Sequence, residues 1–212
     1  MTSPTRPLRR DAELNRQRIL AAAGELFADR GLAVTLDDIA RHAGVGVGTV
    51  YRRYPDKELL IDALFEERLK ALCEAAEAAL ELDDPWAGLV AFFERGGELQ
   101  ARDRGLKELI ADHAHGGDCL IRARDRLRLL VTELFDRAKA AGVVRADAEA
   151  LDTPMIFMML GPLMERARHV DPDLWRRYLG VVLDGLRPAA ATPLPRPALA
   201  PDQLDSVMRT PR

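Results

Sequence analysis

Serine is almost absent from the 212-residue chain, which contains only Ser3 and Ser206, both in segments expected to be tails. A serine hydrolase needs its nucleophile on a rigid element beside a general base. The sequence therefore argues against a Ser-His-Asp enzyme. A phosphate-binding loop, a supported metal-ligand cluster and a paired-carboxylate motif are lacking as well, so we expect neither an enzyme nor a cofactor.

Cysteines and long apolar runs are also scarce. Cys73 and Cys119 are too few for a disulfide framework, which favours a reducing compartment. No run of 18 apolar residues is present, and the first ten residues lack the apolar stretch of a secretory signal. We therefore expect a cytoplasmic protein with no membrane-spanning segment.

Aromatic residues make up only 5% of the chain, whereas Ala, Leu and Arg dominate it. These three residue types favour helices. With 48% hydrophobic and 31% charged residues, the composition is that of a globular chain rather than a fibrous or low-complexity one. The sequence thus predicts an all-α protein.

The net charge of −3 conceals an asymmetry along the chain. Residues 1–60 carry ten Lys and Arg against eight Asp and Glu, a net charge of +2. Residues 61–212 carry 21 against 26, a net charge of −5. A basic N-terminal end on an acidic body indicates an anionic partner at that end.

Two short helices joined by a glycine turn are predicted between residues 35 and 54. The Thr35 hydroxyl can cap the first helix, with Asp38 at its third position in a weak capping box. Gly44-Val45-Gly46 ends that helix, and Val47–Tyr54 forms the second. A longer helical pattern precedes the pair and another follows it, which is the layout of a helix-turn-helix.

The second short helix is basic on its predicted outer face. Residues 41–54 contain three arginines and no acidic residue, and Val50 and Tyr54, four positions apart, can face a core. The outward side chains are then those of Thr49, Tyr51, Arg52 and Arg53. Arginine can bind guanine edges bidentately, while tyrosine and threonine can donate to phosphates, so this helix suits the DNA major groove.

Two runs of residues carry a family resemblance, Thr35–Ala40 and Ala43–Leu60, and the pattern Gly48-Thr49-x-Tyr51 with Lys57 six residues further on is their most specific part. Over about residues 14–64 the chain resembles the DNA-binding domain of the TetR family of bacterial regulators. The resemblance implies a homodimer whose third helix enters the major groove. It also implies a C-terminal all-helical domain that binds a small molecule and then releases DNA.

The resemblance further implies individual roles. Thr35 is similar to the phosphate-contacting cap of the family's second helix, and Tyr51 and Lys57 to its phosphate contacts. The implied groove-facing positions are Val47, Gly48, Thr49, Arg52 and Arg53. Many members have Ser where this chain has Gly46, so the recognition helix lacks a capping hydroxyl here. Base reading then falls mainly on Arg52 and Arg53, with Thr49 a further candidate and Val47 able to touch a thymine methyl.

The rest of the chain completes the predicted organisation. We expect a flexible basic arm at 1–10, a three-helix helix-turn-helix domain at 11–56, and a helical-bundle domain for ligand binding and dimerisation at 57–187. A disordered tail is expected at 188–212, which holds six of the thirteen prolines and no aromatic residue. A short helix is also expected at 106–114.

The last helix of the bundle carries a second resemblance. Asp173–Tyr178 and Asp184–Pro188 are similar to the final helix of a subgroup of TetR regulators. That similarity implies a dimer interface made by the last two long helices. Trp175 and Tyr178 are then dimer or core residues rather than ligand contacts.

The ligand-contacting residues are less well indicated. Methionines at positions i, i+3 and i+4 share a helix face that either packs in the core or lines a pocket, and the same alternatives hold for the phenylalanines. A histidine in the polar turn after residue 112 could hydrogen-bond a ligand. The ligand candidates are Phe92, Phe93, His113, Met155, Met158 and Met159.

Two motifs favour other chemistry only superficially. Gly44–Gly48 has the glycine spacing of a nucleotide loop, but no predicted strand precedes it. Asp112–Cys119 offers several metal-ligand types, but its two histidines, two positions apart, do not share a helix face. We predict neither a nucleotide nor a metal site.

These patterns together predict a dimeric, ligand-responsive regulator that binds a palindromic DNA operator, most readily as a repressor. One alternative is a helical small-molecule-binding protein whose helix-turn-helix is only structural, and failure to bind DNA from its own genomic neighbourhood would favour it. Another is an activator of the same fold, because the sign of regulation depends on operator position. Turnover of the eventual ligand would instead favour an enzyme.

Overall fold

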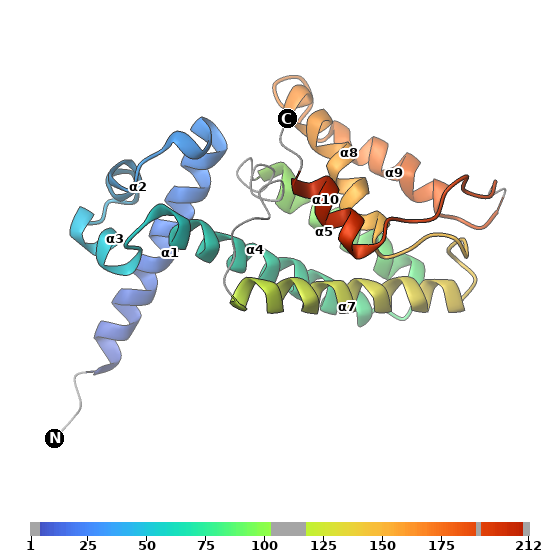
Figure 1. Ribbon diagram of the computed structural model, residues 1–212, viewed down its shortest axis with the longest axis horizontal. Coiled ribbons are helices and arrows are strands. Elements are labelled where there is room, and N and C mark those ends of the chain that lie inside the picture. Colours follow the sequence, from blue (N-terminus) through green and yellow to red (C-terminus); the bar gives the residue numbers. More distant parts are fainter. Residues whose placement is uncertain (1–4, 103–117, 190–191, 210–212) are drawn as a thin grey trace. The chain divides into compact units, whose positions relative to one another are not determined.

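The structure is a computed structural model whose described residues, 5–102, 118–189 and 192–209, form helices joined by turns and loops (Figure 1). The elements are α1 Thr5–Arg30, the 3-10 turn η1 Gly31–Ala33, α2 Leu36–Ala43, α3 Val47–Arg53, α4 Lys57–Leu80, α5 Pro85–Arg102, α7 Asp118–Ala140, α8 Asp152–Ala167, α9 Leu174–Gly185 and α10 Pro201–Arg209. No strand occurs in the described part, which confirms the all-α prediction. The helix expected at 106–114 lies outside the described residues.

The described residues form two compact units, which we call the head, residues 5–65, and the body, which begins at Glu66. This division falls inside α4, nine residues beyond the boundary expected after residue 56. The reason is burial, because Leu60 and Leu64 in the first turns of α4 belong to the apolar core of the head. Further along the same helix, Ala76 and Ala79 belong to the core of the body.

The head is built on the apolar face of α1. Ile19, Ala23 and Phe27 are at most 1% exposed, as their helical spacing predicts. Ile39 of α2 and Val50 of α3 are completely buried in the same cluster. Burial of each large apolar side chain contributes about 1.5–3 kcal/mol. Helix α2 is therefore held by packing against α1, and α3 by packing against α2 in the same cluster.

The body is arranged around α5, which packs against α7, α8 and α9. Two glycines permit this close approach. A Cβ atom added at Gly97 would lie 2.2 Å from the Trp175 ring, and one at Gly96 would lie 2.5 Å from the Phe157 ring. Glycine inside a helix costs about 1 kcal/mol relative to alanine, a cost offset here by burial of Trp175, which is 1% exposed and a core residue.

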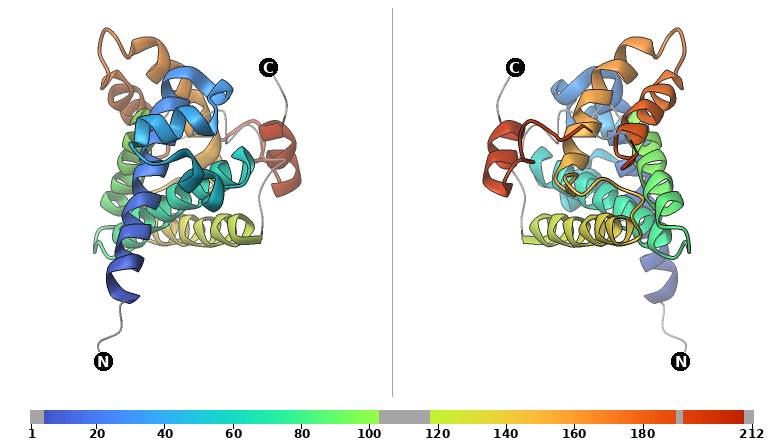
Figure 2. Two further views of the ribbon diagram at one scale, coloured as in Figure 1. Left: turned by 90° about the vertical axis from the view of Figure 1, so that its left-hand side faces the viewer. Right: turned by 90° about the vertical axis from the view of Figure 1, so that its right-hand side faces the viewer.

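Within the body, α7 runs alongside the second half of α4 (Figures 1 and 2). Arg126 of α7 forms an ion pair with Glu77 of α4. Arg137, about three turns further along α7, donates hydrogen bonds to the backbone carbonyls of Leu80 and Leu82, the latter at 3.1 Å. Arg137 therefore satisfies carbonyl groups that the end of α4 leaves without intrahelical donors.

The N-terminal segment differs from the expected flexible arm. Helix α1 starts at Thr5, so residues 5–10 are helical. Pro7 lies in the first turn, where backbone N–H groups have no intrahelical acceptor and the missing donor costs nothing. Leu8, Arg9 and Arg10 are then good helix formers, which explains why the helix begins so early.

The C-terminal segment also differs from the expected disordered tail. It contains an extended stretch, residues 192–200, which we call the C-terminal strap, and then helix α10. The strap is bonded to the Arg145–Asp147 pair, whose guanidinium donates to the Thr192 carbonyl. These partners lie 45 or more residues apart in the sequence, so composition alone could not indicate the contact.

Candidate nucleic-acid interface

Helix α2 begins with the capping box that the sequence predicts. The Thr35 hydroxyl accepts a hydrogen bond from the Asp38 N–H at 3.2 Å, and the Asp38 carboxylate accepts one from the Thr35 N–H at 3.2 Å. The same hydroxyl donates to the carboxylate at 2.6 Å, which lowers the pKa of Asp38. A charged Asp38 is favoured at the N-terminus of a helix, so the cap fixes where α2 starts.

The turn between α2 and α3 depends on backbone conformation. Gly44 has a φ of +65°, a left-handed conformation that side-chain-bearing residues adopt at a cost. The Val45 N–H donates to the Ala40 carbonyl at 3.1 Å, which closes α2 in a Schellman-type arrangement. Gly46 then precedes α3 without a side-chain cap, as predicted from the missing serine.

Helix α3 exposes nearly all of its side chains. Val50 is fully buried, and Tyr54, just past the end of the helix, is 5% exposed. The exposed positions are Val47, Gly48, Tyr51, Arg52 and Arg53, and Thr49 is half-buried. The inward and outward faces are therefore those that the sequence predicts. The outer face carries two guanidinium groups and an apolar valine that is 45% exposed.

Tyr51 has a partner that the sequence does not indicate. Its phenol donates a hydrogen bond to the Asp37 carboxylate in the first turn of α2, which raises the pKa of Tyr51. Fourteen residues separate the two, so no local pattern could reveal the pair. The hydroxyl that the family resemblance assigns to a phosphate therefore has its one proton engaged by Asp37 in this structure.

The cationic residues of the predicted site lie on two consecutive helices. Arg52 and Arg53 occupy the last turn of α3, where the helix C-terminus favours positive charge. Lys57 is the first residue of α4 and is half-buried. Asp56 caps this helix by accepting the Leu59 N–H at 2.8 Å. The short connection between the helices keeps the three cations in one region of the head.

The structure does not gather the predicted ligand residues into one cavity. Phe92 and Phe93 contact each other edge-on with centroids 5.7 Å apart, and both are at most 1% exposed in the core of the body. Met155 is half-buried, whereas Met158 and Met159 are 38% and 62% exposed. His113 lies outside the described residues. The alternative that the phenylalanines are core residues matches their observed burial.

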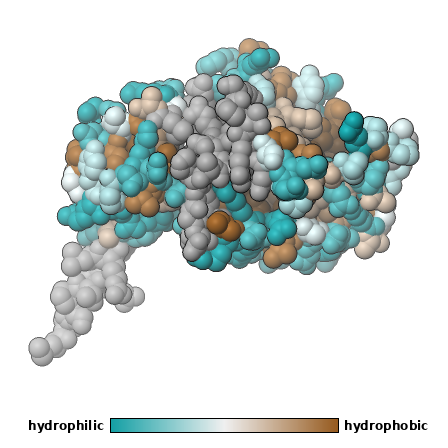
Figure 3. Space-filling model, in the orientation of Figure 1, coloured by the Kyte–Doolittle hydropathy of each residue, from teal (hydrophilic) through white to brown (hydrophobic). Residues whose placement is uncertain are grey.

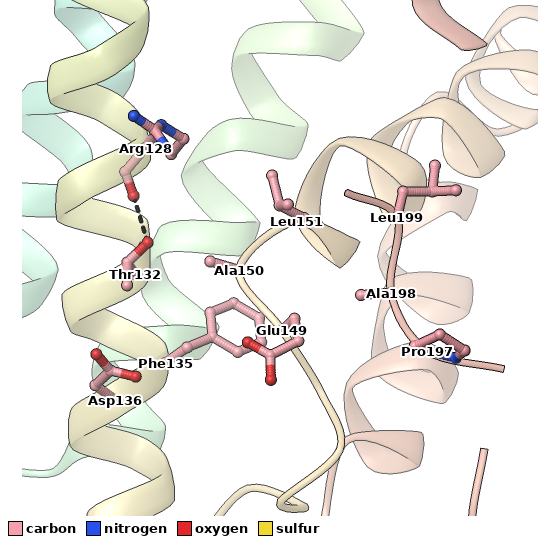
Figure 4. Close-up of a pocket in the computed structure, with 10 residues that line it drawn as sticks. All are labelled: Arg128, Thr132, Phe135, Asp136, Glu149, Ala150, Leu151, Pro197, Ala198 and Leu199. Carbon is pink, nitrogen blue, oxygen red and sulfur yellow. Dashed lines mark hydrogen bonds between the residues drawn. The ribbon is translucent and has the colours of Figure 1, made fainter. Parts of the chain in front are cut away.

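A pocket of about 320 Å³ lies elsewhere in the body (Figure 4). Four side chains of α7, the segment Glu149–Leu151 and the strap residues Pro197–Leu199 line it. None of the described ligand candidates contributes to its wall. Sequence reasoning missed this pocket because one of its walls comes from the tail that we expected to be disordered.

Other chemistry finds little support in the part of the chain that the structure describes. Gly44–Gly48 joins α2 to α3, so no strand precedes it as a phosphate loop would need. No group of three or more His, Cys, Asp or Glu residues suited to a metal ion occurs among the described residues, and Asp112–Gly117 lies outside them. None of the described helices is both long and apolar enough to cross a membrane.

Comparisons with known proteins match both units. Residues 19–64 match a family model described as "Bacterial regulatory proteins, tetR family". Residues 84–188 match one described as "Transcriptional regulator SbtR-like, C-terminal domain". The first match contains the whole turn between α2 and α3, and the second ends just before the strap.

Solved structures with the same fold include a TetR transcriptional regulator from Streptomyces coelicolor, which is 35% identical in sequence and superposes with a TM-score of 0.63. The superposition covers 82% of this chain and 99% of the Streptomyces coelicolor chain. A TetR transcription regulatory protein from Mycobacterium vanbaalenii is 33% identical, covers 85% of this chain and 99% of its own, and has a TM-score of 0.62.

Among curated proteins, an HTH-type transcriptional regulator from Staphylococcus aureus is 34% identical over 89 residues, which is 41% of this chain. The chain matches less than half, 46%, of that relative's length. All of these relatives are named as transcriptional regulators rather than enzymes. The chain therefore belongs to the TetR family of bacterial transcriptional regulators and carries their helix-turn-helix DNA-binding domain.

Proposed function

We propose that the protein is a ligand-responsive transcriptional repressor of the cytoplasm that binds a palindromic operator as a homodimer and leaves it when a small molecule binds. The observation that carries this proposal is the outer face of α3, which exposes Arg52 and Arg53 beside a buried Val50. A helix anchored on one side and cationic on the other is suited to the major groove.

Each predicted DNA-binding residue has a role in this proposal. Arg52 and Arg53 read base edges, and Thr49 and Gly48 lie on the same groove-facing helix, where Val47 contacts a thymine methyl. Thr35, Tyr51 and Lys57 hold the DNA backbone through phosphate contacts. Before DNA binds, the single proton of the Tyr51 phenol is donated to Asp37, so a phosphate contact by this hydroxyl requires that hydrogen bond to be exchanged for one to the DNA backbone.

The proposed dimer interface lies on α8 and α9. Met159 of α8 is 62% exposed, and Tyr178 and Val181 of α9 are 46% and 63% exposed. Figure 3 shows hydrophobic atoms among hydrophilic ones over the part of the body where these two helices lie. Large apolar side chains on neighbouring helices are suited to an interface between copies. We therefore favour an interface role for Met158 and Met159 over ligand contact.

Ligand release is the other part of the proposal. A small molecule acts only through different affinities for the DNA-bound and the free conformations. Phe92, Phe93, Met155 and His113 remain the ligand candidates within the family's helical domain, although the described phenylalanines are packed in the core. An effector for those residues would have to be largely apolar.

Footprinting of the purified protein on the intergenic DNA beside its own gene tests the proposal, at two salt concentrations. We expect a protected two-fold symmetric site with half-sites about 34–36 Å apart or a multiple of that distance. It should resist salt better than random DNA. Weak, steeply salt-dependent coating of all DNA would contradict the operator proposal. Transcription that rises rather than falls when this site is occupied would indicate an activator.

A further inference from the structure

The C-terminal strap is fixed to the body by a charged pair in which Arg145 is buried and Asp147 is exposed. The Arg145 guanidinium donates to both carboxylate oxygens of Asp147, at 2.5 and 3.0 Å, and its side chain is 10% exposed. The same guanidinium donates to the Thr192 carbonyl, and the Leu194 N–H donates to Asp147 at 2.9 Å. Because the matched family model ends at residue 188, this attachment is a feature of the chain's own extension.

The attached strap forms one wall of the pocket on α7 (Figure 4). Pro197, Ala198 and Leu199 lie opposite α7, which contributes Phe135 to the pocket lining. The volume of about 320 Å³ is at the lower end of the range for small-molecule sites. Without the strap, the described lining would consist only of α7 and the segment before α8, which would leave an open groove.

The charges of the pocket are unevenly compensated. Glu149 is paired with Lys139 at 3.0 Å, and Arg128 is paired with Asp125 at 3.4 Å. Asp136 also lines the pocket, and it makes no hydrogen bond or ion pair with any residue that the structure describes. One carboxylate thus remains available beside an apolar wall.

We propose that this pocket binds a small organic cation with an apolar body, with its ammonium group at Asp136 and its apolar part against the strap. A charge-assisted hydrogen bond to the carboxylate selects for the cation. The apolar wall removes hydrocarbon surface from water. The strap residues therefore take part in the site rather than merely covering it.

Helix α7 connects this site to the helix that enters the head. One side of α7 lines the pocket through Thr132, Phe135 and Asp136, while Arg126 and Arg137 hold the end of α4. A bound cation that favours one position of α7 therefore favours one position of α4. This regulatory role rests on the proposed function, whereas binding of the cation does not.

Calorimetric titration of the full chain with 2-phenylethylammonium tests the site. Its neutral analogue 2-phenylethanol and the anion 3-phenylpropanoate provide matched comparisons of nearly the same shape. We expect saturable binding of the cation that is at least about fivefold tighter than that of either analogue. Equal binding of the three compounds, or no binding of the cation, would overturn the proposal.

Two variants locate the binding. Asp136→Asn should weaken cation binding about fivefold or more, whereas Glu94→Gln, which changes an exposed carboxylate on α5, should leave it unaltered. A chain that stops after Ala189, with its helical content verified by circular dichroism, should lose most of the binding. Undiminished binding in Asp136→Asn would assign the cation to another site and overturn the proposal.

Operator DNA separates this inference from the proposed function. If the cation binds and also releases the footprinted DNA in the wild type, but not in Asp136→Asn, both proposals stand. If the cation does not bind while DNA is still protected and released by another compound, only the pocket proposal fails. If the cation binds with the expected selectivity but no operator is found, the pocket stands and the repressor proposal fails.

Discussion

The head and the body are stabilised by contacts of different range along the chain. In the head, the contacts that shape the interface are mostly between neighbours in the sequence, such as the cap between Thr35 and Asp38. In the body, the contacts that decide the arrangement join distant residues, such as Gly97 with Trp175 and Arg145 with Thr192.

This difference separates what each unit needs in order to function. A recognition helix needs a defined start, a defined turn and an exposed face, and a few local residues supply them. The body needs tight packing and a place for an effector, which depend on how helices from different parts of the chain meet. Substitutions in the head should therefore change DNA binding or the local stability of the head, whereas substitutions in the body should change the stability of the body.

The largest expected effect is in the body. Gly97→Ala places a Cβ atom 2.2 Å from the Trp175 ring, so α5 and α9 must move apart. We expect a loss of about 3 kcal/mol in the free energy of unfolding. Trp86 and Trp175 are the only tryptophans and both lie in the body, so denaturant unfolding followed by tryptophan fluorescence measures it. Gly185→Ala, with nothing within 4 Å, is the control and should change little.

The next effect is on DNA recognition by the head. Arg52→Ala or Arg53→Ala should cost about 1–3 kcal/mol in binding to the operator and relax its specificity. Lys57→Ala should weaken all sequences alike and reduce the salt slope by about one unit. Binding titrations on operator and random DNA at several salt concentrations measure both. Equal losses on the two DNAs for both arginine variants would contradict their assignment to base reading.

A smaller effect is expected at the turn of the head. Gly44→Ala meets no steric contact but imposes a φ of +65° on an alanine, which costs about 1 kcal/mol. We expect faster amide hydrogen exchange in peptides from residues 19–64 and no change in the tryptophan transition of the body. A body transition that shifts as much as the head would show that the two units unfold together.

Acid should loosen the strap locally. The hydrogen bond from Arg145, together with the N–H of Leu194, lowers the pKa of Asp147. Because this pKa is lower in the folded state than the unfolded value of about 3.9, the stabilisation is present above about pH 4. It is lost as the pH falls through the folded pKa. The protection factor of the Leu194 amide, which is the unprotected exchange rate at a given pH divided by the observed rate, should therefore fall below about pH 4. Asp147→Asn should lower this protection factor at neutral pH, whereas Asp83→Asn should not.

The smallest effect concerns the missing cap of α3. Gly46 has an extended backbone, and a Cβ atom there would make an ordinary 3.6 Å contact with the Thr49 hydroxyl. Gly46→Ser should therefore stabilise the head by a few tenths of a kcal/mol through an N-cap hydrogen bond. Hydrogen exchange of the α3 amides measures this gain, and slower exchange with unchanged operator affinity is expected.

Much of the interface could be predicted because its signals are local. The cap at Thr35, the glycine turn and the inward spacing of Val50 and Tyr54 are all readable within twenty residues, and the structure confirms each of them. The Asp37 partner of Tyr51 was not predicted. It depends on the angle at which α2 meets α3, which no spacing along the chain reveals.

The body was less predictable for the same reason. A methionine or phenylalanine on a helix face fits a core, a pocket or an interface equally well, and only packing distinguishes them. The structure buries Phe92 and Phe93 and exposes Met158 and Met159. The early start of α1 was likewise missed, because Pro7 lies in the first turn, where a helix tolerates proline. The strap was missed because Arg145, which binds it, lies 47 residues earlier in the sequence than its partner Thr192.

The sequence by itself determined the helical class, the helix-turn-helix and the identity of its exposed residues. Helix caps, glycine turns and side-chain periodicity act over a few residues and need no further partner. Tertiary structure alone decided which apolar residues of the body are buried and where its pocket lies. It also decided that the C-terminal strap forms one wall of that pocket. Burial in the core and the contacts of Arg145 with the strap depend on residues that only folding brings together.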